Sequence, residues 1–220
     1  NIVRAAVARK VKNVISISTD KAVKPVNAMG MTKALQEKIM ISDDFQKDGT
    51  KFSCVRYGNV LGSRGSVIPL WDLKIEKNQP LPVTHPDMTR FMLTLSEAIH
   101  VVFYALKNTK GGEIFVKKAP AAKIVELAKV YAELKSKKKN YPVEYVGIRA
   151  GEKIHEVLVS QEEKRHATEE KNHFIIHKEN EFDTKSIKNL DTLEEYGSNT
   201  GPLLTKSDLK KLMKDLAWLP

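Results

Sequence analysis

A hydroxyl, a carboxylate and an amine stand next to one another in Thr19, Asp20 and Lys21, directly after a short apolar run over residues 14–18. The run is typical of a buried strand, and ligands of open α/β sheets bind at the ends of such strands. Asp20 could therefore act as a general acid and Lys21 as a base, if burial and their mutual charge tune both groups. These residue types predict proton transfer on a bound substrate.

A second amine follows at helical spacing. Residues 29–45 repeat apolar positions with a period near 3.6, which predicts a long helix. Lys33 lies one helical turn beyond Met29, so both side chains can face the same cleft. The alternative is a polar loop that caps this helix through Asn27, and composition alone favours that alternative.

The order of residues 18–33 resembles the active-site region of the nucleotide-sugar 4,6-dehydratases, within the extended short-chain dehydrogenase/reductase family. In that family a Ser/Thr-Asp-Lys triplet follows a strand, and Tyr-x-x-x-Lys follows on a helix. The resemblance covers essentially the whole chain, and it continues over residues 56–69, 88–92, 112–116 and 147–156. Each segment alone is a weak signal, whereas together they are highly specific.

The resemblance implies catalytic roles. Lys21 would remove the C5 proton of the sugar, Asp20 would be the acid at the C6 hydroxyl, and Thr19 would hydrogen-bond the C4 oxygen. Lys33 would hold the nicotinamide ribose of NADP or NAD and lend positive charge nearby. Met29 occupies the family's Tyr position, and a thioether cannot be a general base. The C4 base is therefore open between Thr19 relayed through Lys33, a water, and Lys21.

The resemblance also implies binding residues. Cofactor contacts would come from Ser18, Lys33, Tyr57, Asn59 and Val60. Substrate contacts would come from Asn59, Ser66, Val67, Ile68, Thr84, Arg90, Arg149 and Glu152. The two arginines would contact the diphosphate, and Glu152 would accept from the uridine ribose hydroxyls.

The resemblance implies the function of a UDP-N-acetylglucosamine 4,6-dehydratase, a lyase that makes a UDP-4-keto-6-deoxy-N-acetylhexosamine for surface polysaccharide or capsule synthesis. The amino-acid sequence of residues 27–30, together with Ser198, Asn199 and Thr200 near the end of the chain, favours the branch of the family that inverts C5. The alternatives are a non-catalytic sugar-nucleotide-binding fragment and a related nucleotide-sugar epimerase. The family also implies a homo-oligomer, either a dimer or a hexamer.

The elements that must position these residues alternate between helical and strand patterns, which predicts α/β architecture. We expect the C-terminal half of a Rossmann-like, doubly wound parallel sheet over residues 1–65. Residues 66–220 should form mainly a smaller α/β substrate-binding domain, with 94–118 returning to the Rossmann core. A further helix is predicted over residues 153–159. No Gly-rich turn precedes the opening helix, so we expect this chain alone to bind NADP poorly and to be inactive.

Composition narrows the remaining classes. The formal charge is +10, but the densest basic run, over residues 135–140, lacks interleaved aromatics, so we expect no nucleic-acid partner. No apolar run reaches about 18 residues, so no membrane partner is expected for this segment. Cys54 is the single cysteine, which fits a reducing cytoplasm and a buried apolar role. His173 and His177 flank a strand pattern, and we expect no metal.

Overall fold

The computed structural model describes residues 1–45, 49–63, 65–178 and 193–215. The chain divides into two compact units. Unit 1 comprises residues 1–58, 96–118 and 157–197, and unit 2 comprises residues 59–95, 119–156 and 198–220. The sequence placed residues 157–197 in the second domain, whereas the structure places them in unit 1.

Unit 1 is built on a five-stranded sheet in the order β1-β2-β6-β11-β10. Its strands are β1 (Asn13–Ile17), β2 (Lys51–Arg56), β6 (Ile114–Lys117), β10 (Ala167–Glu169) and β11 (His173–Ile176). The first three pair in parallel, while β11 is antiparallel to β6, and β10 is antiparallel to β11. The predicted α/β Rossmann-like fold with a parallel sheet is therefore confirmed. Pairing with β6 explains why the late segment returns to unit 1, because it continues the ladder beyond that strand.

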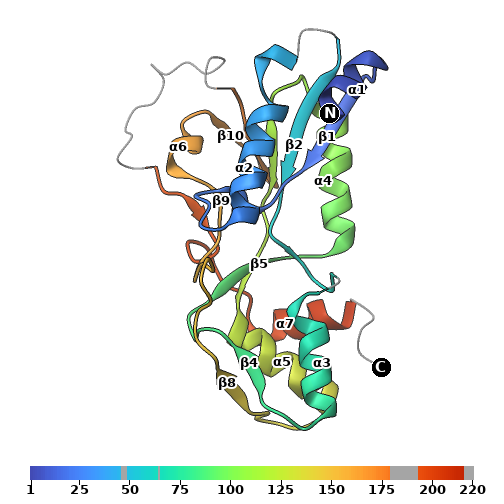
Figure 1. Ribbon diagram of the computed structural model, residues 1–220. Helices are drawn as coiled ribbons and strands as arrows, with labels where there is room; N and C mark the ends of the chain where they lie inside the picture. Colours follow the sequence, from blue (N-terminus) through green and yellow to red (C-terminus); the bar gives the residue numbers. More distant parts are fainter. Residues whose placement is uncertain (46–48, 64, 179–192, 216–220) are drawn as a thin grey trace. The chain divides into compact units, whose positions relative to one another are not determined.

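Helices cover both faces of this sheet. Unit 1 contains α1 (Ile2–Ala8), α2 (Ala28–Met40), nearly all of α4 (Leu95–Asn108), α6 (Gln161–Lys164), and the 3₁₀ turns η1 (Asp20–Ala22) and η2 (Asp43–Phe45). Arg56 of β2 contacts α2, whereas its neighbour Val55 packs with Val101 and Ala105 of α4. Because successive strand residues point to opposite faces, α2 and α4 lie on opposite sides of β2, as Figure 1 shows.

One element differs in type from its prediction. The helix expected over residues 153–159 is absent from that stretch, and strand β9 (Val157–Val159) pairs antiparallel with β12 (Tyr196–Gly197) instead. All three residues of β9 are buried. A strand that is apolar on both faces has no period-2 pattern, so such a short run does not distinguish strand from helix.

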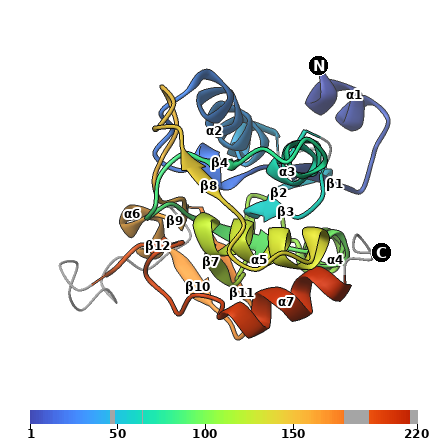
Figure 2. The same ribbon diagram turned by 90° about the horizontal axis from the view of Figure 1, so that it is seen from below.

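Unit 2 combines two small sheets with three helices. The sheets are β3-β5-β7, formed by Asn59–Val60, Thr89–Leu93 and Ala121–Lys123, and β4-β8, formed by Leu81–Val83 and Val143–Tyr145. The helices are α3 (Val67–Glu76), α5 (Ile124–Ser136) and α7 (Lys206–Asp215). Figure 2 shows α5 running between α3 and α7. Trp71, Tyr131 and Leu209 are fully buried in the core that joins these helices.

Two expectations from composition can be examined directly. Cys54 is fully buried in β2, and burial raises the pKa of its thiol to about 12, so it is a core residue rather than a nucleophile. None of the helices within the described ranges has the length and apolar character that crossing a membrane requires.

Candidate active site

The Thr19, Asp20 and Lys21 side chains lie at the carboxyl end of β1. The backbone N–H of Ser18 donates to the carbonyl of Val55 at 2.7 Å, which prolongs the parallel ladder by one residue. The chain then turns into η1, and the Thr19 hydroxyl accepts from the backbone N–H of Lys21 at 3.4 Å. A local hydroxyl cap therefore ends the strand and presents the next two side chains at the sheet edge.

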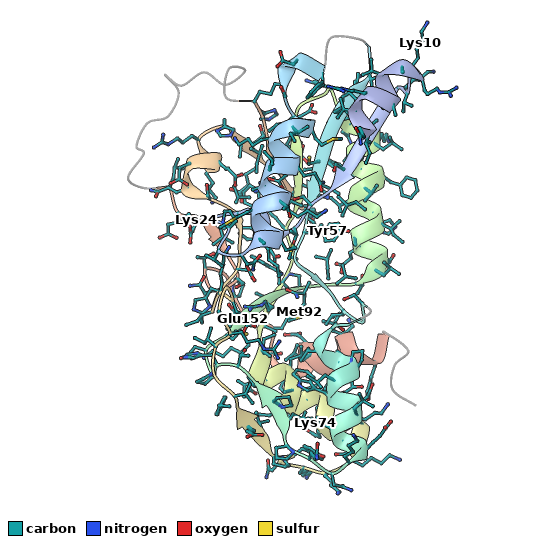
Figure 3. All side chains as sticks on the ribbon, viewed as in Figure 1. Lys10, Lys24, Tyr57, Lys74, Met92 and Glu152 are labelled. Atoms are coloured by element: carbon teal, nitrogen blue, oxygen red, sulfur yellow. The ribbon has the colours of Figure 1, made fainter. Side chains whose placement is uncertain are left out.

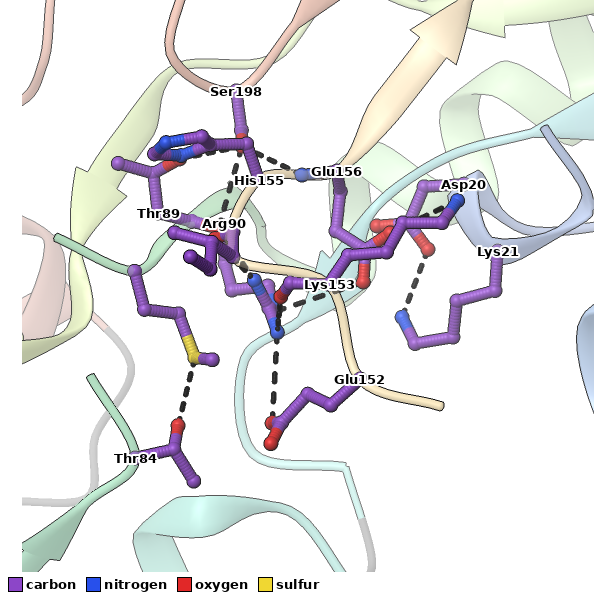
Figure 4. Close-up of polar contacts among 12 residues, drawn as sticks. Asp20, Lys21, Thr84, Thr89, Arg90, Glu152, Lys153, His155, Glu156 and Ser198 are labelled. Atoms are coloured by element: carbon purple, nitrogen blue, oxygen red, sulfur yellow. Dashed lines mark hydrogen bonds and ion pairs between the residues drawn. The ribbon is translucent and has the colours of Figure 1, made fainter. Parts of the chain in front are cut away.

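Both neighbours of Asp20 bind the same carboxylate oxygen. Thr19 Oγ1 and Lys21 Nζ each donate to Asp20 Oδ1 at 2.9 Å. Figure 4 shows the bond from Lys21. Asp20 is fully buried, and within the described part of the chain its Oδ2 atom has no hydrogen-bond partner. One carboxylate oxygen is thus held in place, and the buried second oxygen keeps its capacity to accept a hydrogen bond or carry a proton.

Helix α2 fixes the fourth catalytic candidate. The Asn27 side chain accepts from the backbone N–H of Gly30 at 2.8 Å, so the predicted N-cap is confirmed. One turn into the helix, Lys33 Nζ donates to the carbonyl of Ile17 at 2.9 Å and to Gln36 Oε1 at 3.0 Å. Lys33 is therefore anchored to the same strand end that carries Thr19. Met29 occupies the first turn, is 47% exposed, and supplies no proton-transfer group.

Residues expected to contact a cofactor belong to both units. Ser18, Lys33 and Tyr57 are in unit 1, while Asn59 and Val60 are in unit 2. The Ser18 hydroxyl is buried and lacks a hydrogen-bond partner among the described residues. Burial raises the pKa of Tyr57 above its usual value. The Ser18 hydroxyl and the Lys33 ammonium are both groups that could hydrogen-bond the hydroxyls of a ribose.

All eight residues expected to contact substrate line one cavity of about 300 Å³ in unit 2. They come from β3, α3, β5, the segment after β4, and the loop over residues 146–156. The cavity lining also includes apolar side chains that were not among the expected contacts: Leu61, Leu70, Pro82, Val83, Met88, Met92, Ile124, Leu127 and Val146. Met92 and Glu152 are labelled in Figure 3. The cavity therefore joins an apolar wall to polar groups, as a nucleotide site requires.

Positive charge and free donors gather in this cavity. Arg90 and Arg149 both line it, and Arg149 donates its backbone N–H to Glu152 Oε2 at 3.3 Å. Ser66 begins helix α3 without a side-chain cap, and within the described residues its hydroxyl has no hydrogen-bond partner. The first turn of α3 adds unpaired backbone N–H groups beside the same cavity. This combination suits an anionic group such as a diphosphate.

Sequence reasoning did not predict the contacts of two polar residues next to the expected ones. Gln36 binds Lys33, and its Nε2 also contacts Ser16 Oγ and the carbonyl of Ile17. Its position three residues after Lys33 on a helix was an available signal. Ser198 contacts Thr89, next to Arg90, and nothing in the local pattern indicates that pairing. In the described ranges no group of three His, Cys, Asp or Glu side chains could hold a metal ion.

Known proteins resemble this chain over its full length. The family described as "Polysaccharide biosynthesis protein" matches residues 1–178. An uncharacterized membrane protein of Methanocaldococcus jannaschii and a UDP-glucose 4-epimerase of Rickettsia bellii are each 39% identical over the whole chain. The chain spans 66% of the length of these curated relatives.

Solved structures agree with the fold. Pen from Bacillus thuringiensis is 35% identical, with a TM-score of 0.84 over 97% of this chain and 65% of that one. A dTDP-glucose 4,6-dehydratase from Bacillus anthracis in complex with NAD has a TM-score of 0.59 and 16% identity, over 68% of this chain and 54% of that one. At this identity the second likeness shows the fold alone.

Proposed function

This chain belongs to the polysaccharide biosynthesis protein family, and from that premise we propose that it is a UDP-N-acetylglucosamine 4,6-dehydratase that inverts C5. The observation that carries this proposal is the shared oxygen of Asp20, which binds both the Thr19 hydroxyl and the Lys21 ammonium at 2.9 Å. A neighbouring acid and base are what the loss of water from C5 and C6 of a hexose requires.

The pair can move the proton that this elimination needs. Bound NADP or NAD would supply hydride exchange with the sugar. A proton first crosses the 2.9 Å hydrogen bond from the Lys21 ammonium to Asp20, which leaves a neutral amine beside a protonated carboxyl. Lys21 then takes the C5 proton, while Asp20 gives its proton to the departing C6 hydroxyl, so the ion pair is restored. Once C6 has received hydride, C5 takes a proton from solvent, which balances the proton that the C4 hydroxyl loses on oxidation.

The remaining residues bind and orient. Thr19 would hydrogen-bond the C4 oxygen, and the anchored Lys33 would hold the ribose of the cofactor and favour negative charge at C4. In unit 2 the apolar wall would take the uracil ring, Arg90 and Arg149 the diphosphate, and Glu152 the ribose hydroxyls. Because the Met29 thioether cannot act as a base, the proton of the C4 hydroxyl would go to Thr19, Lys21 or a water.

A second candidate is a nucleotide-sugar 4-epimerase, which the name of the Rickettsia bellii relative favours. Epimerisation at C4 needs hydride removal and return at one carbon, and it does not need an acid at the C6 hydroxyl. A buried carboxylate hydrogen-bonded to an amine at the strand end therefore favours dehydration over epimerisation.

The test follows UDP-N-acetylglucosamine with the complete gene product and NADP or NAD, using NMR in D₂O. We expect a 4-keto-6-deoxy product that carries deuterium at C5, and its stereochemistry decides whether C5 is inverted. The Asp20→Asn and Lys21→Met variants should lose this product while still binding UDP. Lys129→Met, at a surface lysine that pairs with exposed Glu126, serves as the matched control. Formation of UDP-N-acetylgalactosamine without loss of water would make the chain an epimerase instead.

A further inference from the structure

Arg90 holds together two parts of unit 2 through backbone carbonyls. Its Nη1 atom donates to the carbonyls of Thr89 at 2.8 Å and Ile154 at 3.0 Å, and its Nη2 atom donates to the carbonyl of Lys153 at 2.9 Å. The side chain therefore links strand β5 to the loop over residues 146–156. That loop also carries Arg149 and Glu152, which line the same cavity.

Part of the guanidinium makes no hydrogen bond within the described residues. Glu152 Oε1, 3.6 Å from Nη2, and Glu156 Oε1, 3.8 Å from Nε, form ion pairs with it beyond hydrogen-bond length. Of the five N–H groups of Arg90, three are directed to carbonyls. The carbonyls thus fix the plane of the Arg90 guanidinium. Its two remaining N–H groups therefore point in one set direction.

Ser198 fastens both parts that Arg90 links. Its Oγ lies 2.6 Å from Thr89 Oγ1 and accepts from the backbone N–H of Glu156 at 3.0 Å (Figure 4). The backbone N–H of Ser198 in turn donates to the carbonyl of Glu156 at 2.7 Å. Ser198 is fully buried, and Thr89 is 2% exposed, so water cannot replace these bonds at low cost.

Ser198 acts on Arg90 indirectly, through residues that contact both side chains. Ser198 holds Thr89, whose carbonyl accepts from Arg90, and it holds Glu156 at the end of the loop whose carbonyls also accept from Arg90. Thr89 Oγ1 has a further partner in His155 Nδ1 at 2.8 Å, in the same loop. A change at Ser198 would therefore alter both strand β5 and the loop over residues 146–156, whose carbonyls hold the Arg90 side chain.

We propose that Ser198 is a positioning residue of the nucleotide-sugar cavity, which holds the Arg90 guanidinium in the orientation that a diphosphate requires. This inference rests on the proposed function, because it assumes that the cavity binds a nucleoside diphosphate. Ser198 itself does not line the cavity and acts only through Thr89 and the loop.

The test compares UDP with uridine, which lacks the phosphates, in NMR titrations of the complete protein. Ser198→Ala should weaken UDP binding about tenfold and leave uridine binding unchanged. Thr89→Val keeps the shape of the side chain, removes its hydroxyl, and should act in the same direction, so it serves if Ser198→Ala does not fold. Thr205→Ala is the matched control, because it removes a hydroxyl that accepts from the backbone N–H of Asp208 in the same C-terminal segment, away from Arg90.

Each outcome decides the question. If UDP affinity is unchanged in the folded variants, or if UDP and uridine weaken equally, Ser198 has only a structural role. The same conclusion follows if Thr205→Ala weakens UDP binding as much as Ser198→Ala does. If the wild-type protein binds no UDP, the proposed function itself fails, and the role of Ser198 fails with it.

Discussion

Gly30 of helix α2 packs directly against the carbonyl of Lys21. A Cβ atom on Gly30 would lie 2.3 Å from Lys21 O and 3.1 Å from the Cβ of Pro25. This close approach seats the first turn of α2 on η1, the turn that carries Asp20 and Lys21. Glycine is required here because backbone, and not a flexible side chain, occupies the space.

Gly30→Ala should therefore disturb the active-site end of unit 1. The methyl group must displace either η1 or the helix, which should cost about 1–3 kcal/mol of unfolding free energy and reduce turnover. Chemical denaturation and an activity assay measure both effects. Gly201→Ala is the control, since its Cβ would meet nothing within 4 Å. Equal stability of the two variants would contradict the close approach.

Gln36 should matter for turnover and not for UDP binding. Its Oε1 accepts from Lys33 Nζ at 3.0 Å, so Gln36→Ala removes one of the acceptors that orient this ammonium. We expect a fall in kcat of about tenfold, with the Kd of UDP unchanged, because the proposed UDP cavity belongs to unit 2. Gln79→Ala, which removes a surface contact with Lys74, should change neither value. A weaker UDP affinity in Gln36→Ala would argue against this separation.

Breaking the buried ion cluster around Arg56 should strongly destabilise unit 1. Arg56 is 1% exposed and bonds Glu37 at 2.6 Å and Glu163 at 2.8 Å. Burial would lower the pKa of Arg56, but the two carboxylates raise it well above its usual value, so it stays charged. Glu37→Gln should cost about 3–5 kcal/mol, because it leaves a buried charge undercompensated.

The control for this cluster is an exposed ion pair. Glu126 and Lys129 lie 2.8 Å apart on α5, with side chains 43% and 51% exposed. Glu126→Gln should change the unfolding free energy by less than about 1 kcal/mol. Urea denaturation of both variants makes the comparison, and similar losses in the two would show that Arg56 does not depend on Glu37.

Stability should fall as the medium becomes acidic, in part through His155. Burial, followed by the nearby charge of Arg90, lowers the pKa of His155 below 6.5 in the folded protein. The unfolded state therefore binds the proton more readily, and the stabilising contribution of the neutral ring is lost as the pH falls below about 6.5. His155→Gln should reduce the difference in unfolding free energy between pH 7.5 and pH 5.5. If this difference in unfolding free energy is unaltered in the variant, His155 does not contribute to the loss of stability at acidic pH.

The sequence by itself determined the parts that depend on near neighbours. Thr19, Asp20 and Lys21 are adjacent, so a strand followed by a turn is enough to bring them to one edge of the sheet. The Asn27 cap and the turn from Met29 to Lys33 follow from helical spacing in the same way. The alternation of strands and helices was likewise sufficient to predict a Rossmann-like sheet.

Only the tertiary structure decided which distant segments meet. Arg56 bonds Glu163 over 107 positions, and Thr89 bonds Ser198 over 109, and no periodicity links such pairs. The run at β9 is a strand because β12 supplies its hydrogen-bond partners, a fact absent from the run itself. The motifs supplied the eight cavity residues as separate stretches, and the packing of unit 2 made them one cavity. Local patterns fix local geometry, whereas the burial of polar groups selects partners from anywhere in the chain.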